Sequence, residues 1–290
     1  MRDRAIEQFE SIFERASIPV LDIREVVLKR ITVVLKGTTL DESILRLARY
    51  LRTRFGATAR VHWPAALDAA MVAEVARTHE LEQTEEPFGS TVALIGQIAL
   101  AHSQLVLLPE PEDEAARVVD VNALVSGSAP PVLFVRRPID EPRAVFRSIL
   151  HSLSGNFRQT QNFSYSFALV EDDGKLLLLH ALDRDDIGAV REALHVTTDL
   201  SDASEEQVLE NLARSGERYL KGVVAASREK PYTVSYQLRL GNVVEIVQRE
   251  LAAGAYGLLV VGQHKDGFSY ISAGDYQLLN MVRDVPVLAL

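Results

Sequence analysis

The sequence contains no cysteine, so neither disulfides nor thiolate metal ligands are available. A reducing compartment, the cytoplasm, is therefore the expected location. The sequence also lacks an excess of basic residues, because 31 Lys and Arg stand against 40 Asp and Glu and the net charge is −9. A sequence-independent DNA or RNA site needs a basic face, so we do not expect nucleic acid as a partner.

Long hydrophobic runs are absent as well. No stretch approaches the roughly 18 apolar residues of a membrane span, and the first residues, MRDRAIEQFESIFERA, have no apolar signal-peptide core. We therefore expect a protein without direct membrane insertion. Hydrophobic residues nevertheless make up 47% of the 290, which suffices for one large core or two of ordinary size.

One order of expected elements occurs twice along the chain. Residues 31–63 and 146–182 each begin with an apolar strand, a turn with glycine, a helix and a second strand. Each half ends with a helix, a wholly apolar strand, another helix and a last strand, PPVLFV or VPVLAL. Continuous apolar strands alternating with helices indicate parallel sheets covered on both faces. The sequence therefore predicts two tandem, doubly wound α/β domains.

The expected boundary lies in RRPIDEPR, where charge and proline separate two apolar strands. This gives an N-terminal helical extension (1–30), a first domain (31–138) and a second domain (139–290). The strands VLFV and VLAL are entirely apolar, and exposed as edges they would promote aggregation. We therefore expect them to pair with each other or with a second copy of the chain.

The order of these segments and their residues resemble those of a known protein family. The segments ITVVLKGT, SILHSLSGN, KLLLLHAL, AGAYGLLVVGQH and VPVLAL are similar to those of universal stress proteins. Each half resembles one such domain, and residues 31–290 resemble the tandem form. The resemblance implies two five-stranded, mainly parallel sheets with helices on both faces, of the adenine nucleotide alpha hydrolase-like type, and pairing through the last strand.

Some members of this family bind ATP. They carry an aspartate at the end of the first strand and a loop of the form G-x2-G-x9-G-[ST] after the fourth. In the first domain Lys36 stands at the place of the aspartate, and PEPEDEAAR follows the fourth strand without a glycine. The acidic residues Glu112 to Glu114 would repel phosphate. We expect no nucleotide in this domain.

The second domain keeps more of the pattern. The resemblance places its site at Ser154, Gly155, Asn156, Ala181, Gly262, His264, Lys265, Gly267, Gly274 and Asp275. Ser154 replaces the aspartate, and Asp275 stands where the family has a Ser or Thr. A carboxylate at a helix N-terminus caps the helix and occupies the amides that phosphate would use. The loop from Gly262 to Asp275 is thus interpreted as a self-capped form without a cofactor; the alternative is weak binding of ATP or AMP.

No catalytic or metal-binding set is evident. His62, His79, His102 and His195 have no metal-site spacing. His151 and His180 fall in apolar strands, as hydrogen-bonded core histidines do, although His180 would also lie near the cleft. The acidic runs DRDD and EPEDE are interpreted as solvated loops.

Three functional hypotheses follow. The first is a non-catalytic tandem regulatory or stress-response module, acting as a homodimer, as an intramolecular pseudo-dimer or through a protein partner. The second is an adenine-nucleotide sensor that uses the second domain, with or without slow ATP hydrolysis. The third is the soluble regulatory domain of a membrane transporter.

Overall fold

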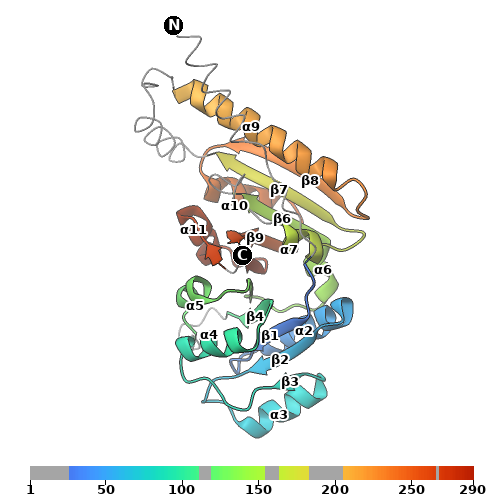
Figure 1. Cartoon of the computed structure of the whole chain (residues 1–290), viewed down its shortest axis with the longest axis vertical. Coiled ribbons are helices and arrows are strands. Elements are labelled where there is room, and N and C mark those ends of the chain that lie inside the picture. The colour runs from blue at the N-terminus through green and yellow to red at the C-terminus, as the bar shows by residue number, and fades with distance from the viewer. Residues whose placement is uncertain (1–25, 111–118, 154–162, 183–204, 266–267) are drawn as a thin grey trace.

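The computed structural model describes residues 26–110, 119–153, 163–182, 205–265 and 268–290 (Figure 1). Ten strands of this part form one sheet in the order β3-β2-β1-β4-β5-β12-β9-β6-β7-β8. The expected N-terminal helix falls mostly outside the described residues, and β1 begins at Arg30. None of the described helices combines the length and apolar character that crossing a membrane requires.

The first half of the sheet contains five parallel strands. They are β1 (Arg30–Val34), β2 (Thr58–His62), β3 (Glu82–Gln83), β4 (Leu105–Pro109) and β5 (Val132–Val135). The helices of this half are α2 (Asp41–Phe55), α3 (Ala69–Thr78), α4 (Thr91–Leu100) and α5 (Val121–Gly127). Strands β1 and β4 are neighbours in the sheet, although β2 and β3 lie between them in the chain. The doubly wound order predicted from the sequence is confirmed.

The second half repeats this arrangement. Its strands are β6 (Ser148–Leu153), β7 (Lys175–Leu182), β8 (Thr233–Leu240), β9 (Leu258–Val261) and β12 (Val287–Ala289). Its helices are α6 (Pro142–Arg147), α7 (Ser164–Leu169), α9 (Glu205–Ala226), α10 (Val243–Ala253) and α11 (Ala273–Met281). The helix α6 was not expected; proline at its first position suits a helix start, because the missing amide hydrogen has no partner there anyway.

The two halves meet where β5 and β12 pair antiparallel. Leu133 lies opposite Leu288 and Phe134 opposite Val287, and every residue of both strands is buried. This is the predicted pairing of VLFV with VLAL, made within one chain. Counted outward from this seam, the two halves have the same strand order, which is last, fourth, first, second and third strand of each half. An approximate internal twofold relation requires this.

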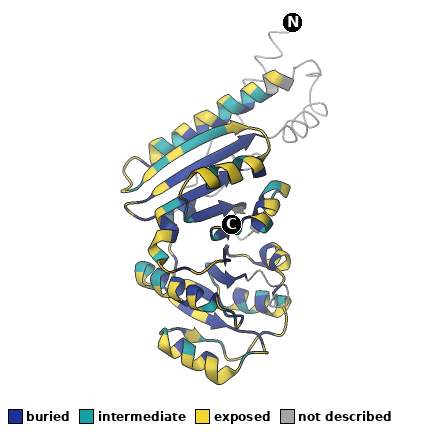
Figure 2. Cartoon of the chain, turned by 180° about the vertical axis from the view of Figure 1, so that it is seen from behind, coloured by how far each residue is buried: buried dark blue, intermediate teal, exposed yellow. Residues whose placement is uncertain are grey.

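Each face of the sheet carries its own apolar core, and both cores run across the seam. Side chains alternate between faces along a strand, so Val33 belongs to one core and Val34 to the other. The first core packs against α2, α3, α7 and α9, and the second against α4, α5, α10 and α11. Figure 2 shows the strands mainly buried and the outer helix surfaces exposed.

One local prediction was wrong. The segment from Gly262 to Asp275 was interpreted as a loop throughout, but β10 (Gln263–Lys265) and β11 (Phe268–Tyr270) within it pair antiparallel as a short separate hairpin. Between them the sequence reads Asp266-Gly267, a dipeptide typical of two-residue hairpin turns. That signal was available in the sequence.

Candidate functional site

The candidate sites lie at the carboxyl edge of the sheet, where the strand order reverses. In doubly wound sheets ligands bind at such switch points, outside the carboxyl ends of the strands. This chain has two, between β1 and β4 and between β6 and β9. The residues that follow these four strands therefore decide what each site can hold.

In the first half, the backbone amides that follow β1 donate hydrogen bonds to the side chain of Asp41. Its carboxylate accepts hydrogen bonds from the amides of Lys36, at 3.1 Å, and Gly37, at 2.8 Å. The Thr38 hydroxyl donates to the same group at 3.0 Å. Burial raises the pKa of Asp41, while these hydrogen bonds act in the opposite direction. The amides that an anionic ligand would use are already engaged.

After β4, the first half places a buried ion pair where a phosphate loop would begin. Glu110 is 3% exposed and pairs with Arg136, which follows β5 and is 4% exposed. The interpretation of this acidic run as a solvated loop is therefore wrong for Glu110, because the guanidinium compensates its burial. The remaining acidic residues of the run lie outside the described residues.

Arg136 also joins the two halves. Its guanidinium donates to the carbonyls of Leu279, at 2.6 Å, and Val282, at 2.8 Å, at the end of α11. The last carbonyls of a helix have no partner within the helix, and a cation there also favours the helix dipole. The Glu110–Arg136 pair thus fixes one helix of the second half to two strands of the first.

Arg54 does the same on the other face of the sheet. It lies on α2 and donates to the carbonyls of Leu169, at 2.6 Å, and Val170, at 2.6 Å, at the end of α7. It also pairs with Glu171 at 2.5 Å, and the Tyr50 hydroxyl donates to that carboxylate. Burial, followed by this hydrogen bond, raises the pKa of Tyr50 to about 12. Sequence reasoning missed both arginines, since no local pattern marks them.

The predicted site residues of the second half fall partly outside the described residues. Ser154, Gly155, Asn156 and Gly267 are among those not described. Ala181 is 2% exposed near the end of β7, and Gly262 directly follows β9. Gly262 has φ +83°, a conformation that glycine adopts without strain. His264 and Lys265 lie in β10. The described positions thus lie in β7, directly after β9, in β10 and in α11.

The N-terminus of α11 is capped by the chain itself. Ser272 is the N-cap, and its hydroxyl accepts from the amide of Asp275 at 3.1 Å and donates to the Asp275 carboxylate at 2.9 Å. Asp275 is fully buried. The sequence predicted a cap by Asp275; in the structure Ser272 is the N-cap, and the Asp275 carboxylate accepts from the Ser272 hydroxyl.

Gly274 is required for helix packing. A Cβ at this position would lie 2.3 Å from Cγ1 of Val243, at the start of α10. The glycine therefore lets α11 approach α10 closely, which gives it a structural reason that is independent of any ligand.

The two core histidines behave as their apolar strands predict. His151 is fully buried and shares a hydrogen bond of 2.8 Å with the Ser166 hydroxyl, and burial lowers its pKa to about 3. His180 is 2% exposed, and its Nδ1 donates to the carbonyl of Leu153 at 3.0 Å. In the described part of the chain, no cluster of three or more His, Asp or Glu could hold a metal ion.

Five strands in the order 3-2-1-4-5, repeated and joined through the last strand, define a tandem, doubly wound α/β protein. The solved structures agree. A universal stress protein from Archaeoglobus fulgidus DSM 4304 has a TM-score of 0.57 and 10% identity, with 89% of this chain and 97% of that chain covered. A universal stress protein structure from Pseudomonas aeruginosa UCBPP-PA14 has a TM-score of 0.60 and 14% identity, covering 91% and 93%.

At these identities the likeness establishes a shared fold. No family profile matches the sequence, and no curated protein matches it either. The predicted resemblance and fold class are therefore confirmed by the three-dimensional structure, with little support from the sequence alone. The chain has the universal stress protein fold in tandem form.

Proposed function

We propose that this chain is a non-catalytic regulatory module of the stress-response type, with its nucleotide sites degenerate. The observation that carries the proposal is that side chains of the protein bind the backbone amides at the carboxyl edge of the sheet. In the first half Asp41 accepts from the amides of Lys36 and Gly37. In the second half the Ser272 hydroxyl accepts from the amide of Asp275 at the N-terminus of α11 and donates to the Asp275 carboxylate. Side chains of the protein thus take the positions that phosphate oxygens would need.

Charge supports the same proposal. A triphosphate placed after β4 of the first half would have to compete with Glu110 for Arg136, because that guanidinium is already bound to the Glu110 carboxylate. At the second switch point it would meet the buried Asp275. Like charges at close range in a poorly hydrated site oppose binding strongly. Such a module would act through protein contacts, with the paired halves as its rigid core.

Calorimetry of the full chain with ATP and with AMP tests the proposal. We expect no binding heat from either nucleotide. Micromolar ATP binding by the parent would contradict it and favour the adenine-nucleotide sensor.

The double variant Lys265→Gly with Asp275→Ser addresses the degenerate site directly. It removes the carboxylate and restores the small and hydroxyl residues of the binding pattern. Gain of ATP binding in this variant alone would support a self-capped remnant. The single variant Lys265→Gly is the matched control, since it keeps the Asp275 carboxylate and its hydrogen bond with Ser272.

A further inference from the structure

Strand β8 forms a long open edge at one end of the sheet (Figure 1). It pairs with β7 along all eight of its residues, and no other strand of the described chain pairs with its outer side. Natural proteins protect such edges with very short strands, proline or charge. Strand β8 contains no proline, and Arg239 is its one charged residue. Its outer side is therefore open to pairing.

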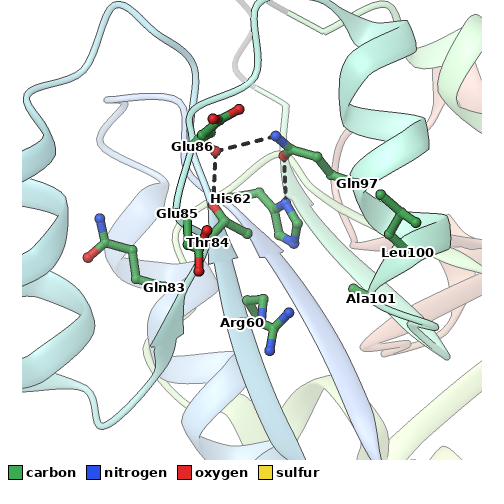
Figure 3. A pocket seen from close by; sticks show the side chains of 9 residues that line it. All are labelled: Arg60, His62, Gln83, Thr84, Glu85, Glu86, Gln97, Leu100 and Ala101. Carbon is green, nitrogen blue, oxygen red and sulfur yellow. Dashed lines mark hydrogen bonds between the residues drawn. The ribbon is translucent and has the colours of Figure 1, made fainter.

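The opposite edge of the sheet is protected. Strand β3 holds the corresponding place in the first half and has only two residues, Glu82 and Gln83. The chain then bends away, because the Thr84 hydroxyl donates to the carbonyl of Glu86 at 3.2 Å, and the exposed Glu85 lies between them (Figure 3). An edge this short and acidic does not suit strand pairing. Association through β8 would therefore stop at two copies, since the far edge cannot continue it.

The direction of the hydrogen bonds in β8 defines which groups the edge offers. The amides of Thr233 and Gly241 point toward β7 and donate to carbonyls there at 3.0 Å each. The amide and carbonyl of one residue lie on the same side of a strand, and the side alternates along the chain. The groups of Val234, Tyr236 and Leu238 therefore point outward, and each residue offers one donor and one acceptor.

The side chains at the same alternate positions form an apolar row on the α9 side of the sheet. The row consists of Tyr232, Val234, Tyr236, Leu238 and Leu240. The first four are partly buried against the apolar clusters of that side, and Leu240 is 58% exposed. A strand that brings apolar side chains to the matching positions would cover this row.

A second copy of β8 supplies such a strand in one antiparallel register. With Tyr236 on a twofold axis, the opposed pairs are Tyr236 with its own copy, Val234 with Leu238, and Tyr232 with Leu240. The outward hydrogen-bonding groups meet in this same register. A shift by one pairing step in either direction places Asn242 opposite Tyr232, or Lys230 opposite Leu240. Only the register centred on Tyr236 pairs the whole apolar row with itself.

We propose that β8 is a dimerisation surface, on which a second copy of this chain pairs antiparallel about Tyr236 and extends the sheet across both copies. Arg239 then lies opposite Thr233 of the partner, so no like charges within the paired strands oppose each other. On the polar face of the strand, Ser235 lies opposite Gln237. The inference goes beyond the proposed function, which is independent of the sheet edges.

The chain has no cysteine, so single cysteines report this register directly. Ser235 and Gln237 point their backbone groups toward β7, and opposed residues of this kind have Cα atoms about 4.5 Å apart, within disulfide range. We expect oxidised glutathione to give a covalent dimer when Ser235→Cys and Gln237→Cys are mixed. Each variant alone is the matched control and should stay uncrosslinked. Crosslinking that is as fast in either variant alone would overturn the register.

Sedimentation equilibrium of the full chain tests the surface itself. We expect the parent to dimerise below about 100 micromolar, and Ser235→Lys with Gln237→Lys to raise the dissociation constant at least about tenfold, because lysines then face each other across the axis. Glu85→Gln with Glu86→Gln changes the net charge equally at the opposite edge and should leave the constant unchanged. A monomeric parent, or a dimer that the lysines do not weaken, would overturn the proposal.

Discussion

Arg136 and Glu110 form a buried ion pair that extends from the ends of two neighbouring strands to the last turn of a helix in the other half of the chain. Neither side chain is more than 4% exposed. Arg283 adds a second contact to Glu110 at 3.4 Å. Such a pair stabilises the protein only while both partners are present. A protein with one buried, unpaired charge is far less stable than a protein with the whole pair or with apolar residues in its place.

Arg136→Met should therefore lower the free energy of unfolding by about 3–5 kcal/mol, since it leaves the buried Glu110 with only the longer contact to Arg283. Urea denaturation at neutral pH measures the effect. The double variant Arg136→Met with Glu110→Leu is expected to recover much of the loss. Arg77→Gln removes an exposed pair and should leave the denaturation midpoint unchanged. Similar midpoints for Arg136→Met and Arg77→Gln would refute the role assigned to the buried pair.

Ser272→Ala should destabilise the protein by about 1 kcal/mol, because the α11 N-cap loses its acceptor and Asp275 loses a donor. Ser272→Thr keeps the hydroxyl and should behave like the parent. Denaturation midpoints distinguish the two variants. A loss as large for threonine as for alanine would indicate a steric effect rather than a cap.

The stability of the fold should fall as the pH decreases from about 7 to about 5. His151 has a folded pKa of about 3, below the ordinary value of 6.5, so the unfolded chain binds the proton first in this range. Protons then favour unfolding, and His151 alone accounts for about 2 kcal/mol. His62 acts in the same direction.

The pair His151→Leu with Ser166→Ala checks this assignment, since it removes both partners of the hydrogen bond. Urea denaturation at the two pH values should give a smaller difference for this variant than for the parent. An unchanged difference would place the pH dependence in other groups.

Residues 1–138 produced alone should self-associate. Without β12, the apolar strand β5 becomes an edge, and pairing with a second β5 restores its hydrogen bonds. Light scattering should show dimers or larger species. A monomeric fragment would argue against the freed β5 edge as a cause of self-association.

Much of the fold was predictable because its signals are local and repeated. Apolar strands such as LLVV and VLFV, alternating with helices, indicate a parallel sheet covered on both faces. The pairing of β5 with β12 was predicted because apolar strands that are exposed as edges promote aggregation. The burial of Glu110 and Arg136 was not predictable, because a charge next to a strand end has the same local sequence whether water or a distant helix receives it. The hydrogen bond between the buried His62 and Gln97 likewise joins residues that lie 35 positions apart in the chain.

The antiparallel pairing of β5 with β12 has one further consequence. When partners are separate molecules, their association weakens on dilution; here a covalent link keeps each half at a high effective concentration beside the other. The pairing is therefore insensitive to the amount of protein in solution. It is also free of the constraint that both partners carry the same substitutions, so one half can hold Lys36 after its first strand while the other holds Ser154.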